Sequence, residues 1–185
     1  MIRTERLLLR IPTDEDRASL RAMLSDAEVM RDLFRDPTPE GADHTLAQHE
    51  AYRRDHGLGF WAVEADGVVA GMCGLKPGAP GTPAEGELEI GWLFDRPFWG
   101  RGIAREAAEA SLAWAWENRD APRVLAITAI SHVRSQRLME RIGMVRLIDG
   151  NFVHPGFTPD DPMRHSVTFA VNRPMVVNRS AIDRL

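Results

Sequence analysis

Residues 98–107, Phe-Trp-Gly-Arg-Gly-Ile-Ala-Arg-Glu-Ala, combine residue types suited to binding a phosphate group. Two glycines stand before an alanine-rich segment whose apolar residues have the spacing of one helical face: Ile103, Ala107, Ala110 and Trp114. Residues 88–94, just upstream, are predicted to form a strand. A strand that leads through a glycine turn into a helix directs unpaired N–H groups and the positive end of the helix dipole at one place. Because Gly102 has no Cβ, a ligand can approach the backbone there, and the segment predicts a phosphate or pyrophosphate site.

The same segment resembles the acetyl-CoA-binding motif of the GNAT superfamily of N-acetyltransferases, Q/R-x-x-G-x-G/A. Gly102 and Ala104 match the last two fixed positions, whereas Trp99 stands where the motif has Gln or Arg. Further segments resemble, in order, the branch of ribosomal-protein N-terminal acetyltransferases: residues 2–10, 135–144, 152–155 and 162–165. The resemblance extends over nearly all of residues 1–173.

This resemblance implies an α+β fold, in which a mixed, mostly antiparallel sheet is flanked by helices. The sheet would splay open between its fourth and fifth strands, here residues 88–94 and 124–129. The pantetheine arm of acetyl-CoA would lie in this gap and pair with the fourth strand as an added strand would. The cofactor-binding residues expected on this basis are Trp92, Leu93, Phe94, Trp99, Gly100, Arg101, Gly102, Ile103, Ala104, His132 and Ser135. The Arg101 side chain either neutralises phosphate charge or is an ordinary exposed arginine.

The remaining elements follow from periodicity and from turn residues. Asp66-Gly67 predicts a hairpin turn, and three prolines and three glycines in residues 77–86 exclude regular structure there. Thr13 is expected to be the N-cap of a helix that begins at the next residue. The expected strands are residues 3–11, 60–64, 68–75, 88–94, 124–129 and 167–172. The other expected helices are residues 43–55, a helix from 103, and 135–142, with a break at residues 36–41. This mixture suits an α+β domain.

Acetyl transfer to an amine requires that the ammonium, with a pKa of about 10, lose a proton. Glu87 and Glu89 are two residues apart, so in a regular strand both side chains face the same side, and either could accept that proton. Glu89 precedes Ile-Gly, the position that resembles the family's fourth-strand acid, and is the favoured base. The alternative is a pair of glutamates on a solvated sheet face.

The proton donor to the departing thiolate is less clear from the residues. Met139 occupies the position where many family members have a tyrosine, and Tyr52 is the chain's single tyrosine. Ser135 matches the serine of an N-x-x-S motif that some members use near the CoA sulfur, or it is simply a helix N-terminal residue. His132 replaces the Asn of that motif, and either contacts the pantetheine arm or caps the loop.

Composition excludes several classes of protein. A net charge of −4 and an isoelectric point near 5.9 argue against a general nucleic-acid binder, and no apolar run is long enough to span a membrane. The charged N-terminus does not resemble a signal peptide, and Cys73, the single cysteine, cannot form an internal disulfide; both fit the cytoplasm. Cys73 reads as a small buried residue rather than a nucleophile. The spacing of His132, His154 and His165 fits no compact zinc motif, so no metal is expected.

These observations predict one domain, residues 1–173, with a C-terminal tail of residues 174–185. The expected activity is acetyl transfer from acetyl-CoA to a primary amine, on a small molecule or a protein N-terminus, by a monomer or homodimer. By resemblance, residues 29–56 and 149–165 form the acceptor side. Their acids either attract a cationic amine or are ordinary surface acids: Asp32, Asp36, Glu40, Asp43, Asp149, Asp160 and Asp161. The alternatives are a CoA-binding sensor or interaction module with weak or lost transfer, and an unrelated α/β domain that binds another phosphate ligand.

Overall fold

A computed structural model describes residues 1–33 and 37–175. In these ranges, nine strands form one sheet in the order β1-β2-β3-β4-β5-β6-β9-β7, with β8 paired to β9. The strands are β1 (Ile2–Arg3), β2 (Leu7–Arg10), β3 (Gly59–Ala65), β4 (Val68–Pro77), β5 (Leu88–Phe94), β6 (Arg123–Ala129), β7 (Val145–Arg146), β8 (Phe152–Val153) and β9 (His165–Asn172). The helices are α1 (Arg17–Leu24), α2 (Ala27–Met30), α3 (Pro39–His56), α4 (Ile103–Asn118) and α5 (Val133–Arg141), with short 3₁₀ turns η1 (Asp14–Asp16), η2 (Arg96–Phe98) and η3 (Pro162–Arg164).

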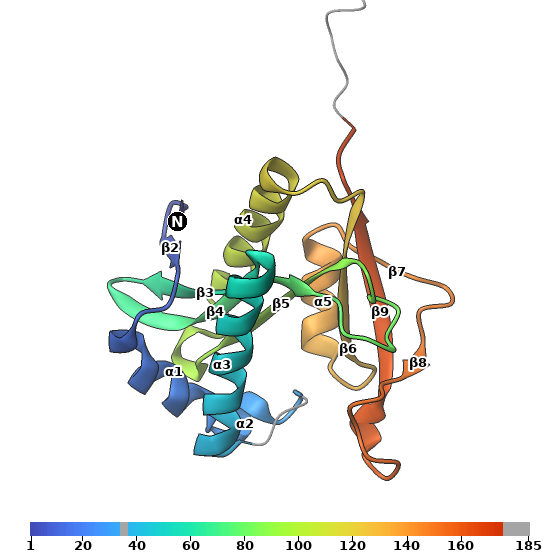
Figure 1. Ribbon diagram of the computed structural model, residues 1–185, viewed down its shortest axis with the longest axis horizontal. Coiled ribbons are helices and arrows are strands. Elements are labelled where there is room, and N and C mark those ends of the chain that lie inside the picture. Colours follow the sequence, from blue (N-terminus) through green and yellow to red (C-terminus); the bar gives the residue numbers. More distant parts are fainter. Residues whose placement is uncertain (34–36, 176–185) are drawn as a thin grey trace, which may run out of the picture.

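Alternation along the strands gives the sheet two apolar faces, and each face carries helices (Figure 1). On one face, Phe60 and Met72 pack in a cluster with residues of α1, α2 and α3. On the other face, their strand neighbours Trp61 and Cys73 pack in the larger cluster that includes α4 and residues of α5. The sheet is thereby held between two helical layers. None of the helices in residues 1–33 and 37–175 is long and apolar enough to cross a membrane.

The sheet opens between β5 and β6, the strands expected to splay. They run parallel and pair only at Leu88 with Val124 and at Glu89 with Leu125. By contrast, β4 pairs with β5 from Gly71 opposite Phe94 to Pro77 opposite Leu88. Beyond Glu89, the edge of β5 that faces β6 therefore has no strand partner in the described part of the chain. The expected α+β architecture and its splayed sheet are confirmed.

The hairpin at Asp66-Gly67 is also as predicted. Both residues have positive φ, +54° and +76°, which a two-residue turn between twisted strands requires. The strand predicted for residues 88–94 has the bounds of β5.

Other boundaries were wrong for identifiable reasons. Residues 3–11 form two short strands, because Thr4 turns the chain by accepting from the Leu7 amide and donating its own amide to the Leu7 carbonyl. The helix predicted for residues 43–55 begins at Pro39, inside the expected break, because the Thr38 hydroxyl caps it by accepting from the Gly41 amide at 3.0 Å. Helix α5 begins at Val133 and β9 at His165, each two residues before the predicted start. Asp36 and most of the expected tail, residues 176–185, lie outside the described residues.

Candidate active site

A cavity of about 510 Å³ lies where β5 and β6 diverge. Its walls come from β5, the C-terminal end of β6, the first turns of α5, one side of α3 and the segments at residues 79–80 and 154–157. It therefore joins the gap between the splayed strands to the segments expected to form the acceptor side. Of the residues predicted to bind the pantetheine arm, Trp92, Leu93, His132 and Ser135 line the cavity, whereas Phe94 is buried and does not. Met139 of α5 lines it as well.

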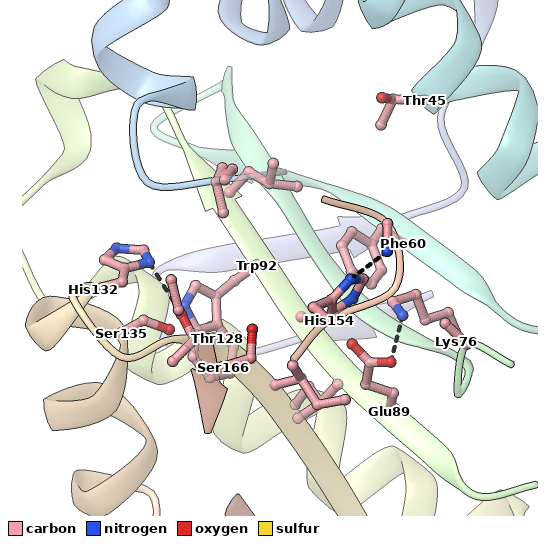
Figure 2. A pocket seen from close by; sticks show the side chains of 18 of the residues that line it. Thr45, Phe60, Lys76, Glu89, Trp92, Thr128, His132, Ser135, His154 and Ser166 are labelled. Carbon is pink, nitrogen blue, oxygen red and sulfur yellow. Dashed lines mark hydrogen bonds and ion pairs between the residues drawn. The ribbon is translucent and has the colours of Figure 1, made fainter. Parts of the chain in front are cut away.

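Glu89 lies in this cavity opposite the chain's only lysine, Lys76. The two residues face each other in the β4–β5 ladder, and the Lys76 Nζ lies 2.5 Å from the Glu89 Oε2 (Figure 2). The Glu89 side chain is 10% exposed and that of Lys76 is 20% exposed. The favoured base is thus a nearly buried carboxylate held by an ammonium group. The register of β4 against β5 places Lys76 opposite Glu89. The sequence did not predict this pairing because a ten-residue loop separates the two strands.

Glu87 does not lie among the residues that line the cavity. It stands one residue before β5 begins, so the alternation of a regular strand does not place it beside Glu89. Its carboxylate instead accepts from Arg123 of β6, with Nη2 at 2.7 Å from Oε1. The expectation that both glutamates share one side is corrected by this ion pair, and of the two glutamates only Glu89 lines the cavity.

Ser135 and His132 lie at the other end of the cavity from Glu89 and Lys76 (Figure 2). Ser135 is in the first turn of α5 and is 7% exposed. The His132 Nδ1 lies 3.2 Å from the Thr128 Oγ1, at the end of β6. Burial lowers the pKa of His132, and the nearby charges of Arg134 and Arg31 act in the same direction against the opposing effect of Asp32. The imidazole is therefore neutral at pH 7.

Asp32 also lines the cavity, and basic side chains surround it. Its Oδ2 lies 3.7 Å from the Arg31 Nη2, 3.6 Å from the Arg134 Nη2 and 3.9 Å from the His132 Nε2. The other acids expected on the acceptor side do not line the cavity where they are described. Asp43 pairs with Arg17 and Arg21, Asp161 caps η3, and three more are exposed: Glu40, Asp149 and Asp160. The acceptor side is thus less acidic than the sequence suggested.

The glycine turn before α4 has the geometry expected of an anion site. Gly100 and Gly102 adopt φ values of +72° and +78°, and Gly102 is the N-cap of α4. The N–H groups of Ile103 and Ala104 lie in the first turn of α4, before the first amide that donates within the helix, Glu106 to the Gly102 carbonyl. They are thus available to an anion at the positive end of the α4 dipole. Ile103 contributes only its backbone, because its side chain is buried in the core.

Side chains around this turn fix its shape. The Trp99 indole donates to the Phe94 carbonyl at 2.6 Å, which ties the turn to the end of β5. Arg101 pairs with the exposed Asp66 at 3.1 Å and remains half-exposed. Two arginines that the sequence gave no reason to choose also reach the turn. Arg6 donates to the Arg101 carbonyl at 3.0 Å, and Arg134 lies over the Trp99 ring at 4.5 Å.

Cys73 and the histidines do not form a metal or nucleophile site. Cys73 is fully buried, and that burial raises the pKa of its thiol to about 12. In residues 1–33 and 37–175, no group of three His, Cys, Asp or Glu side chains is arranged to hold a metal ion. His154 instead lines the cavity, together with the neighbouring residues 155–157.

A family model described as an acetyltransferase (GNAT) domain matches residues 6–145, well over half of the chain. The chain therefore belongs to the GNAT acetyltransferase family, which confirms the expected fold and enzyme class. The family uses acetyl-CoA as its acetyl donor.

Two relatives from Bacillus subtilis (strain 168) extend over most of the chain. The uncharacterized N-acetyltransferase YnaD is 27% identical over 150 residues, which cover 78% of this chain and 82% of the relative. The uncharacterized protein YkkB is 29% identical over 144 residues, which cover 76% of this chain and 83% of that relative.

Solved structures show the same fold. A GNAT-family acetyltransferase from Bacillus anthracis matches with a TM-score of 0.73 and 24% identity, over 93% of this chain and 98% of that one. Spermidine N-acetyltransferase from Vibrio cholerae, in complex with CoA and spermine, matches with a TM-score of 0.73 and 16% identity, over 92% and 97%. Ribosomal-protein-alanine N-acetyltransferase from Brucella melitensis matches with a TM-score of 0.71 and 20% identity, over 89% of this chain and 99% of that one. At these identities the likeness concerns the fold, not the acceptor.

Proposed function

We propose that the protein transfers the acetyl group of acetyl-CoA to a primary amine by direct attack of the amine on the thioester. The observation that carries the proposal is a single cavity between the splayed strands that contains both a free strand edge and a nearly buried carboxylate, Glu89. The free strand edge suits the pantetheine arm of the acetyl donor, and the carboxylate suits the ammonium group of the acceptor.

The donor would bind along β5. Its pantetheine amides would pair with the backbone of Trp92, Leu93 and Phe94, where β5 has no partner in β6. The pyrophosphate would lie against the amides of residues 100–104, with the half-exposed Arg101 beside it. This arrangement directs the thioester into the cavity and leaves the α3 side for the acceptor.

The transfer step would proceed as follows. The acceptor ammonium gives one proton to Glu89, directly or through a water, and its nitrogen then attacks the thioester carbonyl carbon. A C–N bond forms, the carbonyl becomes an oxyanion that a backbone N–H stabilises, and the C–S bond breaks as the carbonyl re-forms. The second proton of the nitrogen passes to the CoA thiolate, with the Ser135 hydroxyl as the candidate relay that gives a proton to sulfur and regains one from the nitrogen, directly or through water. Lys76 occupies Oε2 of Glu89, so Oε1 is the oxygen that would accept the proton.

A second candidate function is a CoA-binding module without efficient transfer. Two observations favour it: Met139 lines the cavity where many family members have a tyrosine, and Lys76 already holds the candidate base. This candidate predicts tight CoA binding without turnover and no effect of Glu89→Gln on any reaction.

Two measurements separate these candidates. Free-thiol release from acetyl-CoA is followed with peptide N-termini, amino acids, polyamines and aminoglycosides, and CoA binding is measured by calorimetry. Acceptor-dependent release supports the transferase. Micromolar CoA binding with release at the hydrolysis rate for every acceptor supports the binding module. Absence of CoA binding contradicts both. A location in the cytoplasm and a monomeric or homodimeric state stay predictions.

A further inference from the structure

The ion pair between Lys76 and Glu89 is the most unusual feature of the cavity. The chain has 23 basic residues, Lys and Arg together, and Lys76 is the one lysine among them. It lies in the ladder directly opposite Glu89, both side chains line the cavity, and both are at least four-fifths buried. A lysine ammonium is a compact charge that binds a carboxylate end-on, whereas arginine favours a planar two-pronged contact.

The pair changes which amines the cavity favours. A nearly buried carboxylate alone would attract any cation, including a polyamine. With Lys76 at 2.5 Å, the cavity presents a positive and a negative charge side by side. At the short distances and reduced dielectric of a cavity, a second cation near Lys76 is repelled as strongly as it is attracted by Glu89. A polycation therefore gains little from this site.

A molecule with adjacent opposite charges complements such a pair. An α-amino acid carries its ammonium and carboxylate groups on the same carbon atom. Placed against the pair in the reverse sense, its ammonium would face Glu89, and its carboxylate would face Lys76. Complementary charges of this kind determine specificity more than affinity.

The cavity walls include aromatic and apolar side chains among polar ones such as Thr45 and Gln48. Phe60 and Tyr52 line the cavity, as do Phe157 and Ile127. The His49 ring, also in the wall, stacks on Phe60 at 4.0 Å and accepts from the Phe60 amide. A compact aromatic group placed here would lie beside the ion pair (Figure 2).

We propose that the acceptor is an α-amino acid with an apolar or aromatic side chain, whose carboxylate is recognised by Lys76 while its ammonium faces Glu89. This inference rests on the proposed transferase activity and names its substrate class. It differs from the spermine seen in the Vibrio cholerae structure, because the acceptor it names has one ammonium and one carboxylate. The competing explanation is that Lys76 only neutralises Glu89 in a buried setting and has no contact with the acceptor.

The test compares acceptors that differ only in the carboxylate. Three pairs serve: phenylalanine with 2-phenylethylamine, tryptophan with tryptamine, and leucine with 3-methylbutylamine, with spermidine as the polycation. We expect kcat/KM for at least one amino acid to exceed that of its decarboxylated partner, and that of spermidine, by about tenfold or more. Equal or better use of the amines or of spermidine would overturn the inference while leaving the transferase proposal intact.

Substitution of the lysine separates recognition from structure. Lys76→Met should lower kcat/KM for the preferred amino acid about tenfold more than for its decarboxylated amine, and Lys76→Arg should restore part of the preference. An equal loss for both members of a pair would show that Lys76 acts only through Glu89. Affinity for CoA, measured on both variants, shows that they are folded.

Calorimetry gives a reading that does not depend on turnover. With CoA present, the wild-type protein should bind the preferred amino acid more tightly than its amine, and Lys76→Met should remove that difference. If no amino acid of the three binds and no thiol is released with it, the inference is wrong. CoA binding in the same experiment shows separately whether the donor half of the proposed function holds.

Discussion

Glu89 and Glu87 have different surroundings because Glu89 lies inside β5, whereas Glu87 lies one residue before the strand begins. Glu89, inside β5, lines the cavity and forms an ion pair with Lys76, whereas Glu87, just before the strand, forms an ion pair with Arg123. The sequence predicted a pair of equivalent acids because it could show their spacing but not the residue at which the strand begins. The structure separates them into one that can reach an acceptor and one that joins β5 to β6.

The two acids give a direct test of the base. Glu89→Gln should lower kcat by about 10²-fold or more at pH 7, because a positioned general base contributes about that factor. The loss should shrink above pH 9, where a larger fraction of the amine is already deprotonated. The measurement is the pH profile of thiol release with a saturating acceptor. Glu87→Gln is the control outside the cavity, and an unchanged rate in Glu89→Gln would exclude Glu89 as the base.

Asp16 is a single residue on which the N-terminal region depends. It is buried, it accepts from Arg10 at 2.6 and 2.8 Å, and it accepts from the Thr13 amide at 2.7 Å. The Arg10 guanidinium is the largest influence that lowers the pKa of this carboxyl, to about 2 from the usual 3.8.

A pKa lowered in the folded state means that the unfolded chain binds the proton more tightly. Asp16 therefore stabilises the fold above pH 4, and this stabilisation is lost as the pH falls towards 2. We expect Asp16→Asn to lower the free energy of unfolding by about 2–3 kcal/mol at pH 7, and by less at pH 3, in urea titrations. Asp14→Asn, an exposed position in the same turn, should change it little. Equal losses at the two pH values would contradict this explanation.

At the scale of elements, the turn before α4 combines a backbone requirement with a binding role. Gly102 has φ of +78°, and a Cβ there would lie 3.4 Å from the Arg6 Nη2. Gly143, after α5, has a similar φ of +84° with open space around it. The two glycines thus share the conformational cost of substitution and differ in whether a ligand is expected beside them.

Gly102→Ala and Gly143→Ala should each lower the free energy of unfolding by about 1 kcal/mol. Only Gly102→Ala should also weaken acetyl-CoA binding, because its methyl group would occupy the surface where the backbone meets the pyrophosphate. Thermal unfolding and calorimetric titration with CoA measure the two effects. Equal affinities in the two variants would place the pyrophosphate elsewhere.

The elements that sequence patterns revealed are those that carry a strong local signal. Strand β5, the hairpin at Asp66-Gly67 and helix α4 follow from alternation, turn residues and helical periodicity. Elements of two to four residues, such as α2, β7 and β8, have no such signal, because neighbours far along the chain determine them. The start of α3 was missed because Pro39 was interpreted as a break, although proline is favoured in the first helical turn.

For the whole molecule, the resemblance to a known family predicted more of the site than the residue types and spacing did. It gave the two strands between which the sheet splays, whereas the glycine turn before α4 followed from the residues themselves. It could not give Lys76, whose pairing with Glu89 depends on strand register. It gave Asp32 only as one of seven acids on the acceptor side, without the contacts that Asp32 makes to His132 and Arg134. Long-range register and loop placement determine the charge balance of the cavity, on which the proposed preference for an amino acid depends.

Donor binding should be visible in the stability of the whole fold. A ligand that binds only the folded chain raises the free energy of unfolding by about 2.7 kcal/mol at a hundred times its dissociation constant. We expect acetyl-CoA to raise the melting temperature, and hydrogen exchange to slow at the β5 amides of residues 90–94 and in the turn at 100–104. Stabilisation without protection in β5 would contradict a donor that lies along this strand. Inorganic pyrophosphate, which lacks the pantetheine arm, should protect the turn alone.

The short junction between β5 and β6 also has a mechanical consequence. In residues 1–33 and 37–175, the ladder from β1 to β5 and the ladder of β6 with β9 are joined by strand pairing only at Leu88 and Glu89, while the core beneath α4 continues from one to the other. Rotation of the two ladders about that point would change the width of the gap without breaking a strand hydrogen bond elsewhere. For a donor bound in this gap, as proposed, such a rotation would widen the cleft for release of CoA and narrow it around the next donor, with the junction at Leu88 and Glu89 as the pivot.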